Sequence, residues 1–161
     1  VDSFIELISI LKDDRFHGLV VGPTAESKQR YLNTLKNKVS DLRISNKITF
    51  TGARSDIVNI YKLSDIVFNL SIKPEPFGRT TIEAISCGSK VIGWNHGGTK
   101  EILEDLYPSG LVPLNDINKL KDTVIQVSKA EHPFPCRNTF TSKKMTENTL
   151  KLYYQLCNIS L

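Results

Sequence analysis

Two glutamates lie where an extended loop leads into a helix. Glu75 stands between two prolines in a loop that ends at Gly78, and Glu83 follows in a helix expected to begin near Arg79. A carboxylate only accepts hydrogen bonds, and sugar hydroxyls donate them. The first amides of a helix lack partners within the helix and, with the helix dipole, attract an anion. The segment therefore predicts a phosphate or diphosphate site from Gly78 to Thr81 between two carboxylates, although a capped core helix would show similar spacing.

Apolar runs alternate with amphipathic runs along the rest of the chain. The expected strands are 16–22, 47–52, 65–70, 90–94 and 110–113. The expected helices are 3–11, a long helix from Thr24 or Ser27 to Leu42, 57–63, one from Arg79, 99–106, 116–130 and a terminal helix over 141–161. This alternation predicts a single α/β domain over residues 1–161, with an open, mostly parallel, Rossmann-like sheet and helices on both faces.

Four linked parts of the sequence resemble the donor-binding signature of retaining family 4 glycosyltransferases, which have the GT-B fold. In order, they are Glu75-Pro76-Phe77-Gly78, then Glu83-Ala84, then Gly88 before a strand, and Gly97-Gly98-Thr99-Lys100-Glu101 after that strand. The resemblance covers nearly the whole chain and implies the carboxy-terminal, donor-binding lobe of such an enzyme. One departure is the turn Gly22-Pro23-Thr24, which lacks the second glycine of the family's Gly-x-Gly-Pro turn.

The resemblance implies a role for each part of the site. Glu75 would be the catalytic residue that holds hydroxyls of the donor sugar, and Glu83 would accept hydrogen bonds from the ribose. The backbone at Ala53 and Arg54 would meet the nucleobase, although Arg54 suits a plain surface position nearly as well. Sugar and diphosphate would lie on the amides of Phe77, Gly78, Arg79, Thr80 and Thr81, and a loop at Gly97 and Gly98 would pack beside the ligand.

The implied activity is transfer of a hexose, with retention, from a nucleoside diphosphate sugar to a glycan or lipid-linked acceptor, as in lipopolysaccharide or capsule biosynthesis. The acceptor would bind through an amino-terminal lobe absent from this chain. Two alternatives stay open: a non-catalytic nucleotide-sugar-binding lobe, and a GT-B-like epimerase or phosphorylase. His96 is expected to be a loop histidine with a polar contact, not a general base, and Glu101 has no assigned role beyond complementing the helix dipole.

By the same resemblance, the first helix is the one that follows the family's first strand of this lobe. That strand, with the phosphate-binding arginine and lysine beside it, would lie outside the chain, so the isolated chain is expected to be inactive. The strands around Leu19 and Ile66 would be left with unpaired inner edges. We expect these edges either to pair directly or to be filled by a borrowed segment.

Composition narrows the function classes. The 21 basic and 17 acidic residues give a net charge of only +4, without exposed aromatics between the basic residues, which argues against a nucleic-acid partner. That charge is compatible with peripheral membrane association of the full protein. Three cysteines without metal-type spacing favour reduced thiols in the cytoplasm, with the inner face of the membrane as an alternative location. No metal is expected, because no cluster of histidines, cysteines and carboxylates has metal-type spacing, and no cofactor is expected, because the nucleotide sugar is itself a substrate.

Overall fold

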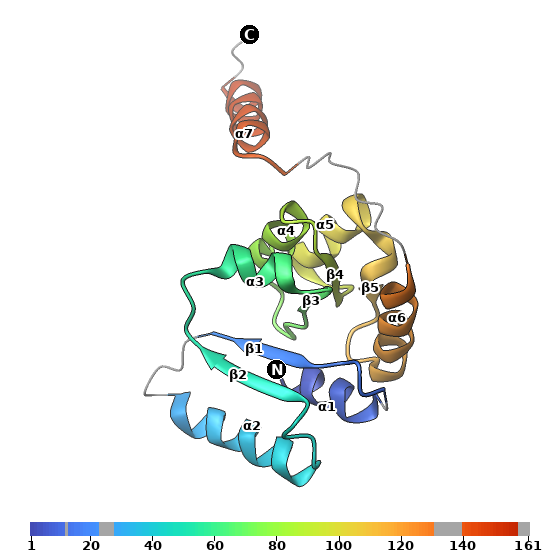
Figure 1. Ribbon diagram of the computed structural model, residues 1–161. Coiled ribbons are helices and arrows are strands. Elements are labelled where there is room, and N and C mark those ends of the chain that lie inside the picture. Colours follow the sequence, from blue (N-terminus) through green and yellow to red (C-terminus); the bar gives the residue numbers. More distant parts are fainter. Residues whose placement is uncertain (12, 23–27, 131–139, 158–161) are drawn as a thin grey trace.

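The computed structural model describes residues 1–11, 13–22, 28–130 and 140–157 and shows the predicted α/β fold (Figure 1). Short parallel strands alternate with helices along the chain. In order, the elements are α1 (Asp2–Ile10), β1 (Gly18–Val21), α2 (Gln29–Asp41), β2 (Ile48–Gly52), α3 (Ile57–Leu63), β3 (Ile66–Asn69), α4 (Arg79–Ser86), β4 (Lys90–Trp94), α5 (Gly97–Leu106), the 3-10 turn η2 (Pro108–Gly110), β5 (Leu111–Val112), α6 (Ile117–Lys129) and α7 (Ser142–Leu156).

The strands form two sheets, not the single sheet that the sequence predicted. Among the described residues, β1 pairs with β2 alone, and β3, β4 and β5 form a second sheet in that order, with every pair parallel. The two sheets lie apart in Figure 1, so the first of the two expected outcomes, direct pairing of the strands around Leu19 and Ile66, is not observed. Among the described strands, the inner edges of these two are unpaired, as predicted. In a mostly parallel sheet, such separated edges are normally filled by a further strand.

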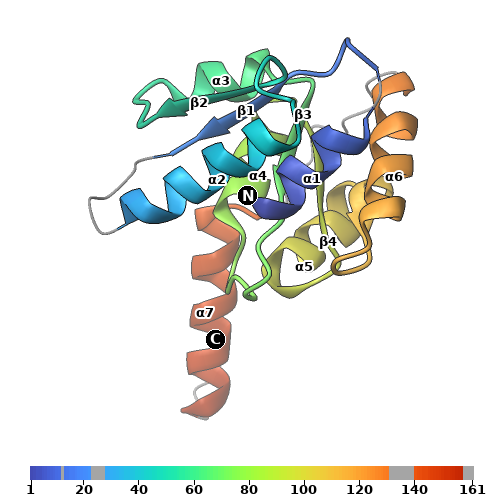
Figure 2. The ribbon, with the colours of Figure 1, turned by 90° about the horizontal axis from the view of Figure 1, so that it is seen from below.

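The core lies around the three-stranded sheet. All five residues of β4 are buried, and α4, α5 and α6 contact this strand. α1 contacts both α2 and α6, and Figure 2 shows it between them. The largest fully buried side chains are Trp94, Ile5, Leu7, Ile92, Ile102, Leu103 and Leu120. The helices that carry the predicted site are therefore anchored on a well-packed sheet.

A buried lysine joins β4 to α6. The Lys90 side chain is in the core, and its Nζ donates to the carbonyls of Val127 at 3.0 Å and Ala130 at 2.6 Å. The last carbonyls of a helix lack partners within the helix, and a cation near that end is favourable. The contact therefore satisfies the carboxyl end of α6 and ties it to the central strand.

Several helix ends differ from the predicted ones. α1 begins at Asp2, one residue before the predicted start, with Val1 as N-cap, and the amides of Phe4 and Ile5 donate to the Val1 carbonyl. α5 begins at Gly97, two residues earlier than predicted. The two predicted starts of the long helix, Thr24 and Ser27, lie outside the described residues.

Side chains cap the amino ends of the last two helices. Asp116 accepts a hydrogen bond from the Lys119 amide at 2.8 Å, and Thr141 accepts one from the Lys144 amide at 3.2 Å. α7 projects away from the sheets in Figure 1 and leaves Met145 and Leu156 about 67% and 71% exposed. Among the described helices, none has the length and apolar character needed to cross a bilayer.

Candidate functional site

The site is built where β3 ends and the chain turns into α4. Asn69, the last residue of β3, is only 6% exposed. Its amide nitrogen Nδ2 donates to Glu75 Oε2 at 3.2 Å and to Thr81 Oγ1 at 3.1 Å. The hydroxyl of Thr81 also lies 3.4 Å from that of Thr99 on α5. A side chain fixed in the core thus holds the Glu75 carboxylate at the carboxyl end of the sheet.

The first turn of α4 offers fewer amides than the sequence predicted. Gly78 is the N-cap with φ of 83°, a left-handed conformation that suits glycine. Its carbonyl accepts from the Thr81 amide at 3.0 Å, and the Thr81 side chain is fully buried. Thr81 therefore faces the protein, not a ligand. Arg79 and Thr80 are exposed, and within the described residues their amides make no backbone hydrogen bond outside the helix.

Gly97 and Gly98 hold the Glu75 loop in place. The Gly98 amide donates to the Glu75 carbonyl at 2.8 Å. A Cβ on Gly98 would overlap the backbone carbonyl of Phe77, and a Cβ on Gly97 would lie 2.9 Å from the Glu75 carbonyl oxygen. Two loops that are far apart in sequence therefore pack backbone against backbone. The two glycines allow this close packing because they have no side chain.

His96 serves the same arrangement. Its Nε2 lies 3.1 Å from the carbonyl oxygen of Ile72, which accepts the hydrogen bond. The prediction of a loop histidine with a polar contact is confirmed.

Glu101 is exposed on α5. Among the residues that the structure describes, there is no group of histidines, cysteines and carboxylates able to hold a metal ion.

Glu83 lies on the outer side of α4 among polar partners. Arg79 contacts it across one helical turn at 3.3 Å, and the hydroxyl of Tyr61 on α3 donates to its Oε2 at 3.4 Å. Burial, followed by the charge of Glu83, raises the pKa of Tyr61 above its usual value of 10.0. Glu83 is therefore half-buried and accessible, with two groups that set its orientation.

A cleft of about 1230 Å³ reaches part of this site, but Arg79 and Glu83 do not line it. Asn69, Glu75, Thr80 and Tyr61 are among its lining residues. Ala53 and Arg54, predicted at the nucleobase, do not line it. Arg54 instead makes a bidentate ion pair with Asp56, with distances of 2.8 and 2.7 Å.

Sequence reasoning missed Asn69 and Tyr61. In the sequence, Asn69 is a polar residue within an apolar strand. A side-chain amide at such a position, where burial is expected, is the signal that could have identified it. Tyr61 lies within a short helix whose residues showed no motif, and only the packing of α3 against α4 brings its hydroxyl to Glu83.

Comparison with known proteins identifies the family of this chain. The model of the family Glycosyl transferases group 1 matches residues 1–151. Mannosylfructose-phosphate synthase of Agrobacterium fabrum (strain C58) is 36% identical over 101 residues, which are 61% of this chain and 22% of that protein. D-inositol 3-phosphate glycosyltransferase of Mycolicibacterium smegmatis is 31% identical over 115 residues, 70% of this chain and 26% of that protein. The chain therefore spans about a quarter of the length of these curated relatives.

Solved structures agree with this family. A glycosyltransferase from Rickettsia africae matches with a TM-score of 0.79 and 28% identity, over 98% of this chain and 44% of that one. HepE of Anabaena, solved in complex with UDP-glucose, matches with a TM-score of 0.72 and 25% identity, over 80% of this chain and 35% of that one. Both matches cover most of the present chain and less than half of the other protein.

Proposed function

Because the chain belongs to the Glycosyl transferases group 1 family, we propose that it is the donor-binding, carboxy-terminal lobe of a retaining hexosyltransferase. Membership of this family supports the proposal that the chain is part of an enzyme that transfers a sugar from a nucleotide sugar. The finer statements, that the sugar is a hexose, that its configuration is retained and that the acceptor is a glycan or lipid-linked molecule, are our proposal. The acceptor would be held by a lobe outside these residues, and the full protein would act in the cytoplasm or at the inner face of the membrane.

The observation that carries the proposal is the anchored Glu75 carboxylate beside the exposed amides of Arg79 and Thr80. Asn69 fixes the Glu75 side chain, and Gly98 fixes its backbone. A sugar hydroxyl can donate to the carboxylate while diphosphate oxygens accept from the amides. Departure of a diphosphate builds negative charge, and preorganised amides stabilise such charge without reorganising.

The remaining roles follow from position. Glu83 would accept from the ribose hydroxyls, and the backbone at Ala53 and Arg54 would approach the nucleobase. Phe77 is exposed near the end of the same loop and would contribute its amide to the sugar. No metal is assigned to the reaction, so donor binding should be unchanged by a chelator.

UDP and UDP-glucose are the first ligands to test, because the related Anabaena protein was solved with UDP-glucose. We expect Glu75→Ala to keep the affinity for UDP and to lose the preference for UDP-glucose, and Glu83→Ala to weaken both ligands. A lost hydrogen bond to a charged group corresponds to about 1.5 to 3 kcal/mol. Isothermal titration calorimetry measures both affinities.

A matched control is Glu104→Ala, since Glu104 forms a comparable exposed pair with Lys100 on α5, at 3.6 Å. Its binding should equal that of the unchanged chain. Equal losses for UDP in the Glu75 and Glu83 variants would refute the division of roles. The isolated chain should transfer no sugar, because it cannot position an attacking hydroxyl, and turnover by this chain alone would contradict that part of the proposal.

A further inference from the structure

The segment that leads into α7 contacts the rest of the domain at its first described residue, Phe140. Phe140 is half-buried, whereas residues 141–153 are all exposed. Figures 1 and 2 show α7 leaving the domain beside α4. Met145 and Tyr153 are 67% and 60% exposed, so most of this helix lies away from the core. Phe140 therefore links the start of α7 to the domain.

Phe140 borders a groove between α3 and α4. The groove has a volume of about 430 Å³, and its apolar lining includes Ile57 of α3 and Ile82 of α4. Glu83 and Tyr61 line it as well, so the groove adjoins the carboxylate that is predicted to accept from the ribose. An aromatic ring buries a large apolar area and has only two side-chain torsions to restrain. The groove therefore anchors Phe140 next to the candidate site.

The ring of Phe140 also contacts the loop that carries Glu75. Its centroid lies 6.2 Å from that of Phe77, with an angle of 65° between the two ring planes. Such edge-to-face pairs are favourable because the positive edge of one ring meets the negative face of the other. Phe77 is 46% exposed, so this contact restrains a side chain that is only partly packed.

The backbone of Phe77 is fixed at a second point. A Cβ on Gly98 would overlap the Phe77 carbonyl, so the β4–α5 turn packs directly on this peptide. Phe77 also immediately precedes Gly78, the N-cap of α4. With its carbonyl against Gly98 and its ring against Phe140, Phe77 has little freedom to rotate about its backbone bonds. The direction of its amide therefore depends on both contacts.

We propose that Phe140 is a positioning residue of the candidate site. By holding the ring of Phe77, it sets the direction of the Phe77 amide, which would donate to an oxygen of the donor sugar. Phe140 itself touches no substrate in this arrangement. Its effect on the loop stands on the ring contact alone, whereas its effect on sugar binding rests on the proposed function.

Three substitutions separate the two contacts of Phe140. Phe140→Leu keeps an apolar side chain in the groove but has no ring for Phe77, Phe140→Tyr keeps the ring, and Phe140→Ala removes both contacts. NMR spectra report the amide shifts of Phe77 and Gly78 without any ligand. We expect these two amides to shift in the leucine and alanine variants and to keep their positions in the tyrosine variant.

Titration calorimetry measures what the ring contributes to donor binding. An aromatic pair of this kind corresponds to a change of about two- to tenfold, so Phe140→Leu should weaken UDP-glucose binding by that factor and keep the affinity for UDP. Tyr153→Leu is the matched control, because it replaces an exposed aromatic side chain of α7 that does not line the groove. This control should leave the amide shifts and the affinity for UDP-glucose unchanged.

A double substitution tests whether Phe140 acts through Phe77. In a Phe77→Leu chain, which retains the backbone amide, adding Phe140→Leu should cause no further loss of affinity for UDP-glucose. A further loss as large as in the unchanged chain would overturn the proposal, as would unchanged Phe77 and Gly78 amides in Phe140→Leu.

Two further outcomes distinguish this proposal from the proposed function. Shifted amides in Phe140→Leu with an unchanged preference for UDP-glucose over UDP would overturn the positioning role, because the ring contact would then be packing alone. If the unchanged chain binds neither UDP nor UDP-glucose, the proposed function fails, and the amide shifts decide whether Phe140 fixes the loop.

Discussion

β4 and β3 are neighbouring strands of one sheet, yet they differ in burial. β4 is paired on both edges and is buried at every residue, whereas β3 is paired on one edge and is buried only at Asn69. Both strands read as equally apolar in the sequence. The difference shows that burial here depends on whether a strand has two neighbours, and that the one buried residue of β3 is the one that holds Glu75.

The largest test of this comparison is truncation of one isoleucine in each strand. Ile92→Ala in β4 removes a side chain with no exposed surface and should lower the free energy of unfolding by about 2 to 5 kcal/mol. Ile66→Ala in β3 removes a half-buried side chain and should cost less than half as much. Urea unfolding measures both. Equal losses would mean that β3 is as well packed as β4 in solution.

Gly98→Ala tests the junction between the β4–α5 turn and the Glu75 loop. The added Cβ overlaps the Phe77 carbonyl, so one backbone must move, at about 1 to 3 kcal/mol of stability. The variant should also lose its preference for UDP-glucose over UDP. Gly88→Ala is the control for binding, since that glycine has open space around it and only its φ of 86° strains an alanine. Unchanged sugar preference in Gly98→Ala would separate this junction from the site.

Asn69→Ala tests whether the buried end of β3 positions Glu75. Without the amide, Glu75 is free to turn, and affinity for UDP-glucose should fall by about 1 to 3 kcal/mol while affinity for UDP is kept. Ser71→Ala is the control, because it removes a hydrogen bond to the Lys73 carbonyl in the same loop without touching Glu75. A parallel loss of UDP affinity in Asn69→Ala would indicate a general disturbance of the loop.

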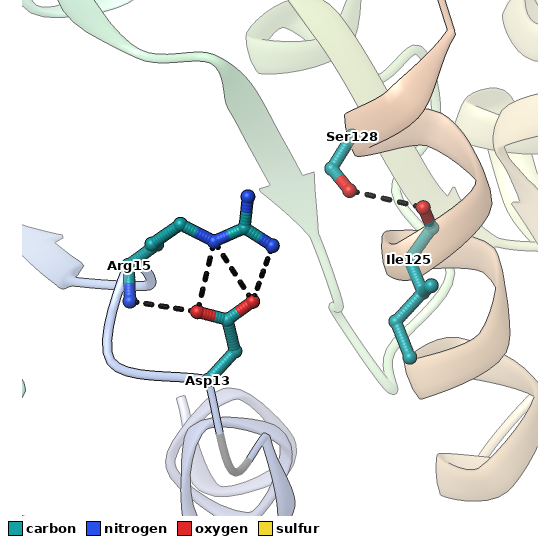
Figure 3. Close-up of polar contacts among 4 residues, drawn as sticks. All are labelled: Asp13, Arg15, Ile125 and Ser128. Atoms are coloured by element: carbon teal, nitrogen blue, oxygen red, sulfur yellow. Dashed lines mark hydrogen bonds and ion pairs between the residues drawn. The ribbon is translucent and has the colours of Figure 1, made fainter.

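The smallest expected effect concerns the exposed loop that leads into β1. Hydrogen bonds from Arg15 lower the pKa of Asp13 from 3.8 to about 2 (Figure 3). Because the folded-state pKa is the lower one, the interaction stabilises the fold above about pH 4 and is lost as the pH falls through about 2. Arg15→Gln should return the pKa of Asp13 toward 3.8. An NMR titration of the Asp13 carboxyl carbon measures this, and an unchanged midpoint would contradict the assigned cause.

Local patterns in the sequence predicted much of the fold. The helix Ile57–Leu63 and the strand Lys90–Trp94 have their predicted bounds. These features depend on residues close together in the chain. The start of α1 was missed because the Val1 carbonyl accepts the first helical hydrogen bonds, and a backbone acceptor leaves no sequence signal.

The split sheet and the support of Glu75 depend on distant residues. Leu19 has the apolar character of a buried strand residue, but its exposure is set by the unfilled edge beside it. The motif predicted Glu75 and the opening of α4, whereas Asn69 and Tyr61 act through contacts across the fold. Thr81 belongs to the motif and still faces inward, because a helix that packs on the sheet must bury one side of its first turn.

The hydrogen bonds between Lys90 and the end of α6 allow this amine to report on the opening of that contact. Amine-directed reagents need an accessible nitrogen, and Lys90 is 7% exposed with its Nζ held by two carbonyls. Lys90 should therefore be modified far more slowly than exposed lysines such as Lys100. Its rate of acetylation, read by mass spectrometry, would record how often the junction of β4 and α6 opens, without any substitution in the chain.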